Sequence, residues 1–240
     1  MKVELTPSYI LHRRDYSETS LILDVVSREH GRINLIAKGA KRNKKQQNPN
    51  FNLYQKYNIS WVAKSDLGTL TDIELETFAE SLKPEQMMTG FYMNEIMLRL
   101  LHKHEPHPEI FDSYEQAIKR LIDGDSEQIV LRYYEKTLLQ SLGYGVILDH
   151  EVETGESLNN EMDYFYKFDY GPILTSNKDK SGITISGKTL LELDNESLSE
   201  TKNINEAKVL LRTILDQHLG DKPLASKKLY QAYIKHKKKD

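Results

Sequence analysis

Five short apolar runs, separated by turn-like residues, constrain the fold of the first 80 residues more than any other feature. The runs are rich in isoleucine, leucine, valine and tyrosine, and the pieces between them read REHGR, NPNF and SDLG. This pattern predicts short strands. Five strands in so short a stretch are expected to form a small closed barrel, because closure removes unpaired edges, and an OB-type barrel is the natural choice.

The periodicity changes to a helical one near Lys83. Apolar residues recur every three or four positions in three consecutive segments, with Pro84 suited to the first turn of the first segment. Asp125 or Ser126 can cap the third segment, and Gly143 stands where a glycine follows a helix. Helices joined this tightly predict a bundle.

The second half of the chain predicts an irregular segment followed by further helices. Residues 149–186 are acidic, with a hairpin expected around a Gly171-Pro172 turn. A helix is expected from Asn205 as N-cap to Gly220 as stop, before a lysine-rich tail. The predicted class is an α+β multidomain protein, and its expected parts are a barrel over 1–80, helices over 81–148, an insertion over 149–186, and helices with a basic tail over 187–240.

Composition excludes several kinds of site. The chain has no cysteine, so disulfides, zinc–thiolate sites and cysteine nucleophiles are all excluded. It contains no run of about 18 apolar residues, the length that predicts a membrane span. Its first residues lack the apolar stretch of a signal peptide. We therefore expect a cytoplasmic protein.

The charge is polarised along the sequence, although the net charge is only −3. Residues 149–205 hold twelve acids and five lysines, whereas residues 222–240 hold seven lysines and one aspartate. The strongest basic run has Glu29 as its one acid, and its seven cations are Arg28, Arg32, Lys38, Lys41, Arg42, Lys44 and Lys45.

This basic run has two interpretations. A lysine-rich surface loop can simply keep a protein soluble, whereas a row of cations on a barrel can bind a phosphate backbone through counterion release. Single strands also need aromatic rings for base stacking. The barrel segment offers six, several of which must be core residues: Tyr9, Tyr16, Phe51, Tyr54, Tyr57 and Trp61.

Two stretches raise the alternative of catalysis. The histidines and glutamates of HKHEPHPE, from His102 to Glu109, could hold a divalent metal for a hydrolase. Two prolines break the spacing that would align them, so a solvated connection between helices is the expected reading. In HRRDYSETS nothing positions His12, Asp15 or the serines as a catalytic set. An RNA-binding protein or a protein scaffold is a third possibility.

The third helical segment carries a cation beside an apolar face. Leu131, Leu138 and their neighbours are core residues by default, and Arg132 is expected to be a solvated charge. An apolar groove edged by such a cation can, however, accept an acidic and hydrophobic peptide from a partner.

Several long stretches resemble the RecO family of bacterial recombination mediators. YILHRRDYSETSLILDVVSREHGRINLIAKGAKR resembles the N-terminal signature of that family. GFYMNEIMLRLLHKHEPHPEIFDSYEQAI resembles its first helical segment, and LRYYEKTLLQSLGYG and HLGDKPLASKKL resemble later ones. The similarity runs from Tyr9 to about Tyr230.

The resemblance implies an OB barrel, a helical domain and an inserted region like a zinc finger. It also implies a protein that is not an enzyme and needs no cofactor. Such proteins bind single- and double-stranded DNA, anneal complementary strands and engage RecR. They bind the C-terminal tail of single-strand-binding protein and let RecA load on gapped DNA. A cytoplasmic, nucleoid-associated location follows.

On this resemblance, the seven cations are expected to contact DNA phosphates, and the tail lysines with Lys222, Lys227 and Lys228 are expected to extend that surface. Leu131, Arg132 and Leu138 are expected to dock the tail of single-strand-binding protein. One departure stands out, because many members carry paired cysteines in the insertion and this chain has none. We expect a finger-like shape without metal, held by the aromatic residues Tyr164, Phe165, Tyr166, Phe168 and Tyr170.

Overall fold

A computed structural model describes residues 1–41, 51–76, 81–174 and 181–237. Contacts divide the chain into two compact units. The first comprises Met1–Asp123 with Lys222–Asp240, and the second comprises Gly124–Asp221. This division follows packing, so it assigns two helices of the predicted helical domain to the same unit as the barrel. No helix in the described part of the chain is both long and apolar enough to cross a bilayer.

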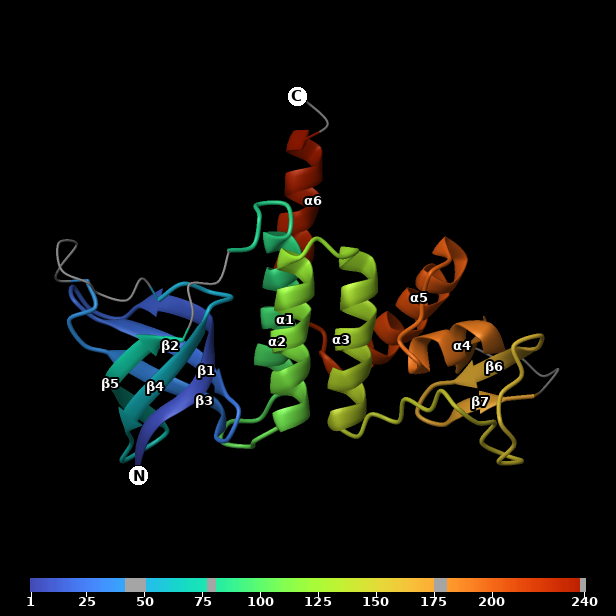
Figure 1. The fold of residues 1–240 in the computed structure, drawn as a ribbon, viewed down its shortest axis with the longest axis horizontal. Coiled ribbons are helices and arrows are strands. Elements are labelled where there is room, and N and C mark those ends of the chain that lie inside the picture. Colours follow the sequence, from blue (N-terminus) through green and yellow to red (C-terminus); the bar gives the residue numbers. More distant parts are fainter. Residues whose placement is uncertain (42–50, 77–80, 175–180, 238–240) are drawn as a thin grey trace. The chain divides into compact units, whose positions relative to one another are not determined.

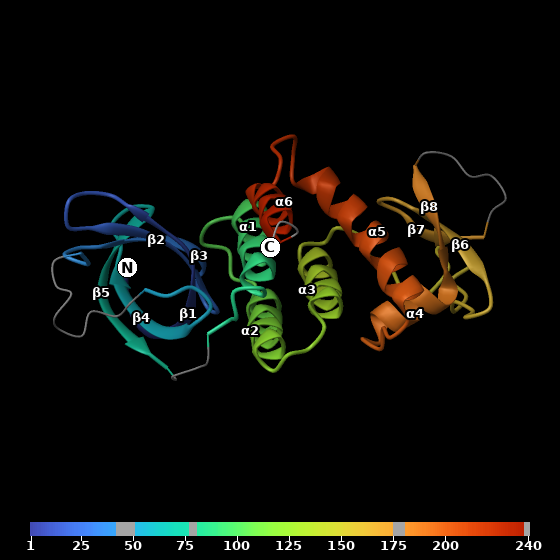
Figure 2. The ribbon, with the colours of Figure 1, turned by 90° about the horizontal axis from the view of Figure 1, so that it is seen from above.

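The five predicted strands form an OB-type barrel, as expected (Figures 1 and 2). Strand β3 runs parallel to β5, while the other neighbours are antiparallel, and β4 pairs with both β5 and β1. The pairings therefore follow the order β1-β2-β3-β5-β4 and return to β1. The strands are β1 (Lys2–Asp15), β2 (Leu21–Ser27), β3 (Gly31–Ala37), β4 (Lys56–Val62) and β5 (Leu67–Leu75).

Alternate residues of these strands fill the barrel. Leu23 and Val25 on β2, and Ile33 and Leu35 on β3, are each at most 1% exposed and belong to one core cluster with Trp61. Successive side chains of a strand point to opposite faces, so the residues between them, Asp24 and Asn34, face outward from the barrel core.

Helices α1 (Met87–Leu100) and α2 (Pro108–Ile122) belong to the same unit as the barrel. Pro108 is the first residue of α2, where a proline costs no hydrogen bond. The expected place of Pro84 was wrong, because it lies in a turn and α1 begins three residues later. In Figure 2 these helices lie beside the barrel strands.

A bulge in β1 determines how these helices join the barrel. The β1–β2 register shifts between Ile10 and His12, which leaves the Leu11 carbonyl outside the ladder. The Asn94 amide of α1 donates to that carbonyl at 2.7 Å, and the Tyr114 hydroxyl of α2 donates to Asn94 Oδ1 at 2.7 Å. Asn94 is only 3% exposed, so three elements meet in one buried polar contact.

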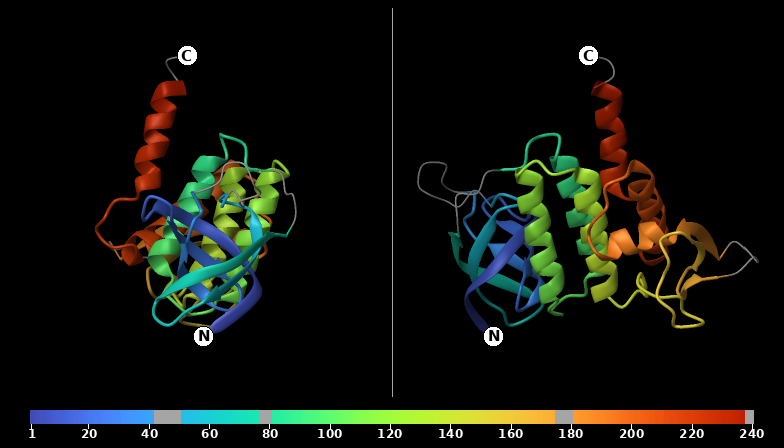
Figure 3. Two further views of the ribbon diagram at one scale, coloured as in Figure 1. Left: turned by 90° about the vertical axis from the view of Figure 1, so that its left-hand side faces the viewer. Right: turned by 45° about the vertical axis from the view of Figure 1, so that its right-hand side comes forward.

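Helix α6 (Ala225–Lys237) is attached to α1 through its first turn (Figure 3). The Glu95 carboxylate accepts hydrogen bonds from the main-chain N–H groups of Ala225 at 2.9 Å and Ser226 at 2.8 Å. A carboxylate at a helix N-terminus is favoured by the helix dipole. Burial alone would raise the pKa of Glu95, but these hydrogen bonds and Arg99 outweigh it and lower the pKa.

The second unit combines a small sheet with three helices. The sheet has the order β7-β6-β8, and its strands are β6 (Asp163–Lys167), β7 (Gly171–Ile173) and β8 (Gly182–Ser186). The helices are α3 (Glu127–Ser141), α4 (Gly187–Asp194) and α5 (Thr201–His218). The hairpin was predicted, but its turn is residues 168–170, since Gly171-Pro172 already pairs with β6.

The helix ends show which local signals held. Gly143 and Gly220 follow α3 and α5 with φ of +75° and +70°, as a glycine after a helix requires. Asn205 as N-cap was wrong, because α5 begins at Thr201. The amide of Asn203 donates to Glu192 of α4 at 2.8 Å, and this tertiary contact supports the extra turn.

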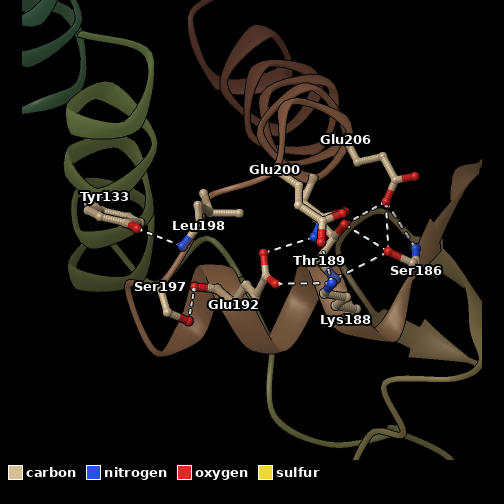
Figure 4. A network of polar contacts seen from close by, with 10 residues as sticks. Tyr133, Ser186, Lys188, Thr189, Glu192, Ser197, Leu198, Glu200 and Glu206 are labelled. Atoms are coloured by element: carbon tan, nitrogen blue, oxygen red, sulfur yellow. Dashed lines mark hydrogen bonds and ion pairs between the residues drawn. The ribbon is translucent and has the colours of Figure 1, made fainter. Parts of the chain in front are cut away.

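Glu206 joins α5 to the start of α4 (Figure 4). Its Oε2 accepts from the hydroxyls of Ser186 at 2.9 Å and Thr189 at 2.6 Å, while Ser186 also caps α4. Burial alone would raise the pKa of Glu206, but these hydrogen bonds lower it. Tyr133 of α3 contacts the connection between α4 and α5, because its hydroxyl accepts a hydrogen bond from the Leu198 N–H at 2.9 Å.

Glu151 organises the insertion. Its Oε2 accepts from the N–H groups of Glu153 at 3.2 Å and Thr154 at 2.7 Å, and from the Thr154 hydroxyl at 2.7 Å. Its Oε1 lies 3.4 Å from the N–H of Leu174, beyond β7. One buried carboxylate therefore holds a tight loop and ties it to the next strand. Of the aromatics expected to support the insertion, Tyr164, Phe165 and Tyr166 are buried, whereas Tyr170 is 47% exposed.

Replacing Asn94 with leucine should lower the free energy of unfolding by about 1–3 kcal/mol, because it leaves the Leu11 carbonyl and the Tyr114 hydroxyl buried without this partner. Urea denaturation measures the change. As a control, Asn205→Leu on the exposed face of α5 should change stability by less than about 0.5 kcal/mol. Equal effects of the two substitutions would contradict the role given to Asn94.

Protonation of Glu151 should loosen the insertion at low pH. Burial opposes ionisation of Glu151, but hydrogen bonds from Thr154, Glu153 and Leu174 lower its pKa below the ordinary 4.5. A lowered native pKa means that the contribution to stability is complete above pH 4.5 and is lost as pH falls through the native value.

Amide hydrogen exchange of Thr154 and Leu174 should therefore accelerate at low pH, beyond the intrinsic dependence of exchange on pH. In Glu151→Gln the exchange should already be fast at neutral pH, with little further loss of protection on acidification. Identical protection in the two proteins at neutral pH would show that the carboxylate does not hold this loop.

Candidate nucleic-acid interface

One end of the barrel gathers the β1–β2 turn and the start of the β3–β4 connection. The Tyr16 N–H donates to the Ser20 carbonyl at 3.1 Å, and the Ser20 N–H donates to Ser17 Oγ at 3.2 Å. The Lys41 N–H donates to the Thr19 carbonyl at 3.0 Å, which joins the connection to the turn. OB barrels use loops of this kind, together with the β2–β3 face, to bind oligonucleotides.

The cations at this end differ in how they are held. Lys38 is exposed, and no ion pair of its ammonium is found among the described residues. The Lys41 ammonium lies 2.9 Å from Asp15 and donates to the Ser17 carbonyl at 3.0 Å, so it is fixed over the turn. Arg42, Lys44 and Lys45 lie outside the described residues. Lys38 and Lys41 are therefore the two predicted cations that the structure places together here.

Asp24 is the acid on the adjoining outer face of the barrel, and the chain compensates its charge. It is 9% exposed and accepts a hydrogen bond from the amide of Asn34 on β3. Arg14 Nη1 and His12 Nδ1 lie 3.7 Å and 3.4 Å from its Oδ2. Arg14 is not one of the seven predicted cations, although its place in the HRRD string of the first strand could have indicated it.

The β5 side of the barrel has the opposite character. Asp72 and Glu74 on β5, and Asp66 just before it, are exposed. A phosphate backbone would be repelled there. The end that carries Lys38 and Lys41 also holds the exposed acids Asp15 and Glu18, so its described charges balance. It therefore suits a polyanion better than the acidic β5 side does.

Arg28 and Arg32, two of the seven predicted cations, hold the helical segment onto the barrel. Arg28 donates from Nε and Nη2 to the two Asp112 oxygens, both at 2.8 Å, and these hydrogen bonds lower the pKa of Asp112. The guanidinium of Arg32 donates to the Leu98 carbonyl. The structure therefore engages both side chains with groups of the chain itself, away from Lys38.

The glycine of the EHGR string is required sterically where the β2–β3 turn meets the connection between α1 and α2. Gly31 has φ of +65°, and a Cβ added to it would lie 2.0 Å from the Glu105 carbonyl oxygen. The His104 N–H also donates to the Arg32 carbonyl at 3.0 Å. The HKHEPHPE stretch is thus the connection between α1 and α2, packed against the β2–β3 turn.

This connection gives no support to the hydrolase alternative. Within the described ranges, no three histidine, aspartate or glutamate side chains come close enough to hold a metal ion. His107 Nε2 lies 3.8 Å from a Glu105 oxygen, which makes a pair rather than a ligand set. The stretch instead forms the predicted connection between helices, and it packs against Gly31 and Arg32.

Arg132 was expected at the exposed edge of a groove, but it is buried. It is 4% exposed, and its Nη2 lies 2.7 Å from the carboxylate of Glu135, which is itself 1% exposed. Leu138 is fully buried and Leu131 partly buried. The reason is local, because positions 132 and 135 lie one helical turn apart and neutralise each other inside the unit.

The lysines near the C-terminus lie on or beside α6. Lys222, Lys227 and Lys228 are exposed, and the main-chain carbonyl of Lys222 accepts a hydrogen bond from Arg99. Nothing in the described chain neutralises Lys227 or Lys228 by an ion pair. Their charge remains available to an acidic partner.

Comparison with known proteins agrees with this architecture. A family model described as Recombination protein O N terminal matches residues 1–78, which contain the barrel. A second, described as Recombination protein O C terminal, matches residues 82–228. Together they cover almost the whole chain.

Individual proteins show the same similarity. "DNA repair protein RecO" of Nitrosococcus oceani is 38% identical over 234 residues, which is 96% of this chain and 94% of that protein. The protein of the same name from Coxiella burnetii is 38% identical over 228 residues, 95% and 98% of the two chains. That of Nitrosospira multiformis is 35% identical over 231 residues, 96% of each. The chain therefore belongs to the RecO family of DNA repair proteins.

Proposed function

We propose that this chain is a non-catalytic recombination mediator. It binds single- and double-stranded DNA, anneals complementary strands, and helps RecA load on gapped DNA coated with single-strand-binding protein. RecR is its proposed partner in that step, and the proposed location is the cytoplasm, at the nucleoid. The observation that carries the proposal is the exposed end of an OB-type barrel that holds Lys38 and Lys41, in a chain of the RecO family.

The chemistry of this end suits DNA of any sequence. Ammonium groups such as those of Lys38 and Lys41 bind phosphates as point charges and do not read bases. Contact that ignores sequence is what annealing needs, because the two strands themselves supply the specificity. The acids of β5 restrict binding to one side of the barrel, and Lys227 and Lys228 on α6 offer further positive charge.

We propose that the tail of single-strand-binding protein docks at Leu131, Arg132 and Leu138 of α3. Arg132 is 4% exposed and paired with Glu135, and Leu138 is fully buried, so docking requires this part of α3 to open and the peptide carboxylate to replace Glu135. Arg132 Nε is buried and finds no hydrogen-bond acceptor among the described residues, so a donor is left for an incoming carboxylate. An arginine fork suits a carboxylate better than a lysine does.

The variant Lys38→Gln/Lys41→Gln should bind single-stranded oligonucleotides more weakly, because two phosphate contacts are lost. The slope of log affinity against log salt concentration should shrink by about 1.4, at about 0.7 per contact. Fluorescence anisotropy with a labelled oligonucleotide over a salt series measures the slope.

A charge-matched control is Lys2→Gln/Lys64→Gln, which removes two exposed lysines elsewhere on the barrel. Its salt slope should equal that of the unsubstituted protein. If both folded double variants show the unsubstituted slope, DNA does not bind at the Lys38 end.

Substitution of Arg132 tests the peptide site. Removing one member of a buried ion pair costs about 3–5 kcal/mol, so the informative variant is Arg132→Met/Glu135→Leu, which leaves no buried charge unpaired. This variant should fold yet bind a peptide of the tail's acidic and apolar composition at least tenfold more weakly by calorimetry. Unchanged affinity in the folded double variant would move the site elsewhere.

A further inference from the structure

The barrel end offers an aromatic ring as well as cations. A ring can stack on a nucleic-acid base only if one of its faces is accessible. The other five aromatics of the barrel segment are excluded, because each is at most 6% exposed: Tyr9, Phe51, Tyr54, Tyr57 and Trp61. Tyr16 is 57% exposed. The structure thus selects one ring from six that the sequence left equivalent.

The backbone beneath Tyr16 is held in place before any ligand arrives. Its N–H donates to the Ser20 carbonyl at 3.1 Å, and the Ser17 N–H is directed to the same oxygen at 3.4 Å. The Lys41 ammonium crosses the turn to the Ser17 carbonyl at 3.0 Å. A ring on an ordered turn loses less conformational entropy when a base stacks on it.

Positive charge lies beside the ring. Lys41 contacts Asp15 and Ser17, the residues on either side of Tyr16, and Lys38 begins the same connection three residues earlier. A phosphate held by Lys41 would therefore bring its own nucleotide close to the ring. Cations that follow the backbone and aromatics that accept bases are the two parts of a single-strand site.

Two other described tyrosines are exposed, but neither lies on the barrel: Tyr170 is in the insertion, and Tyr230, which is 51% exposed, is on α6. Tyr170 is 47% exposed, but the Lys167 ammonium already lies 5.6 Å from its ring centroid, within the acidic insertion. A single exposed aromatic needs no functional explanation by itself. What distinguishes Tyr16 is its place on a hydrogen-bonded turn at the end of an OB-type barrel that holds Lys38 and Lys41.

We propose that Tyr16 stacks on a base of single-stranded DNA whose backbone is held by Lys38 and Lys41, an assignment that rests on the proposed function. Bases of an intact duplex are stacked on each other and cannot reach the ring. Tyr16 therefore favours single over double strands, whereas the lysines serve both.

The test compares Tyr16→Ala, Tyr16→Phe and the matched control Tyr170→Ala, each with a thymidine oligonucleotide, an abasic oligonucleotide of the same length and a duplex. Tyr16→Ala should bind the thymidine strand about 5- to 100-fold more weakly. Its salt slope and its affinity for the duplex and the abasic strand should not change. Tyr16→Phe and Tyr170→Ala should bind as the unsubstituted protein does.

The outcomes separate the two proposals. If the unsubstituted protein binds all three nucleic acids but Tyr16→Ala binds the thymidine strand equally well, the stacking role is overturned and DNA binding stands. An equal loss on abasic and thymidine strands also overturns stacking, because no base is then involved. If the unsubstituted protein binds none of the three, the proposed function itself fails.

Discussion

The hydrogen bonds of Asn94 are the interaction on which the first unit depends. A bulge in β1 exposes the Leu11 carbonyl, and the cost of burying it unpaired would be about 1–3 kcal/mol. Asn94 satisfies that carbonyl and is itself satisfied by Tyr114, so the barrel, α1 and α2 are fixed by one residue. The close approach of Gly31 to Glu105 and the attachment of α6 to Glu95 both build on the resulting position of α1 and α2.

This architecture divides the cations of the basic run into two groups. Arg28 and Arg32 lie at the β2–β3 turn, where α1 and α2 supply acceptors, and they act as connectors within the unit. Lys38 and Lys41 lie at the far end of β3, where the nearest acceptors belong to the β1–β2 turn. One strand thus separates cations that stabilise the fold from cations that can meet a polyanion. The sign of the charge of a sequence segment does not by itself distinguish these two groups of cations.

Patterns that depend on neighbouring residues were readable from the sequence, and partnerships between distant residues were not. The apolar runs of β2 and β3, the helical spacing in α2, and the glycines after α3 and α5 all express local geometry, and all were predicted. The predicted start of α5 was wrong, because Asn203 has a hydrogen-bond partner on α4. The predicted exposure of Arg132 was wrong, because Arg132 is buried in an ion pair with Glu135. The role of Arg28 required knowing that Asp112 lies opposite. Tyr16 could be separated from five similar rings only by burial.

The loop built around Glu151 makes the insertion independent of zinc and of the reductants that keep thiols reduced. A thiolate site must capture zinc in competition with other proteins, and its sulfurs must stay reduced. Main-chain amides gathered by a carboxylate need neither. Oxidants that break DNA would convert zinc-binding thiolates to sulfenic acids, but this chain offers no thiol to them. Oxidation of thiols therefore removes no contact that holds this insertion.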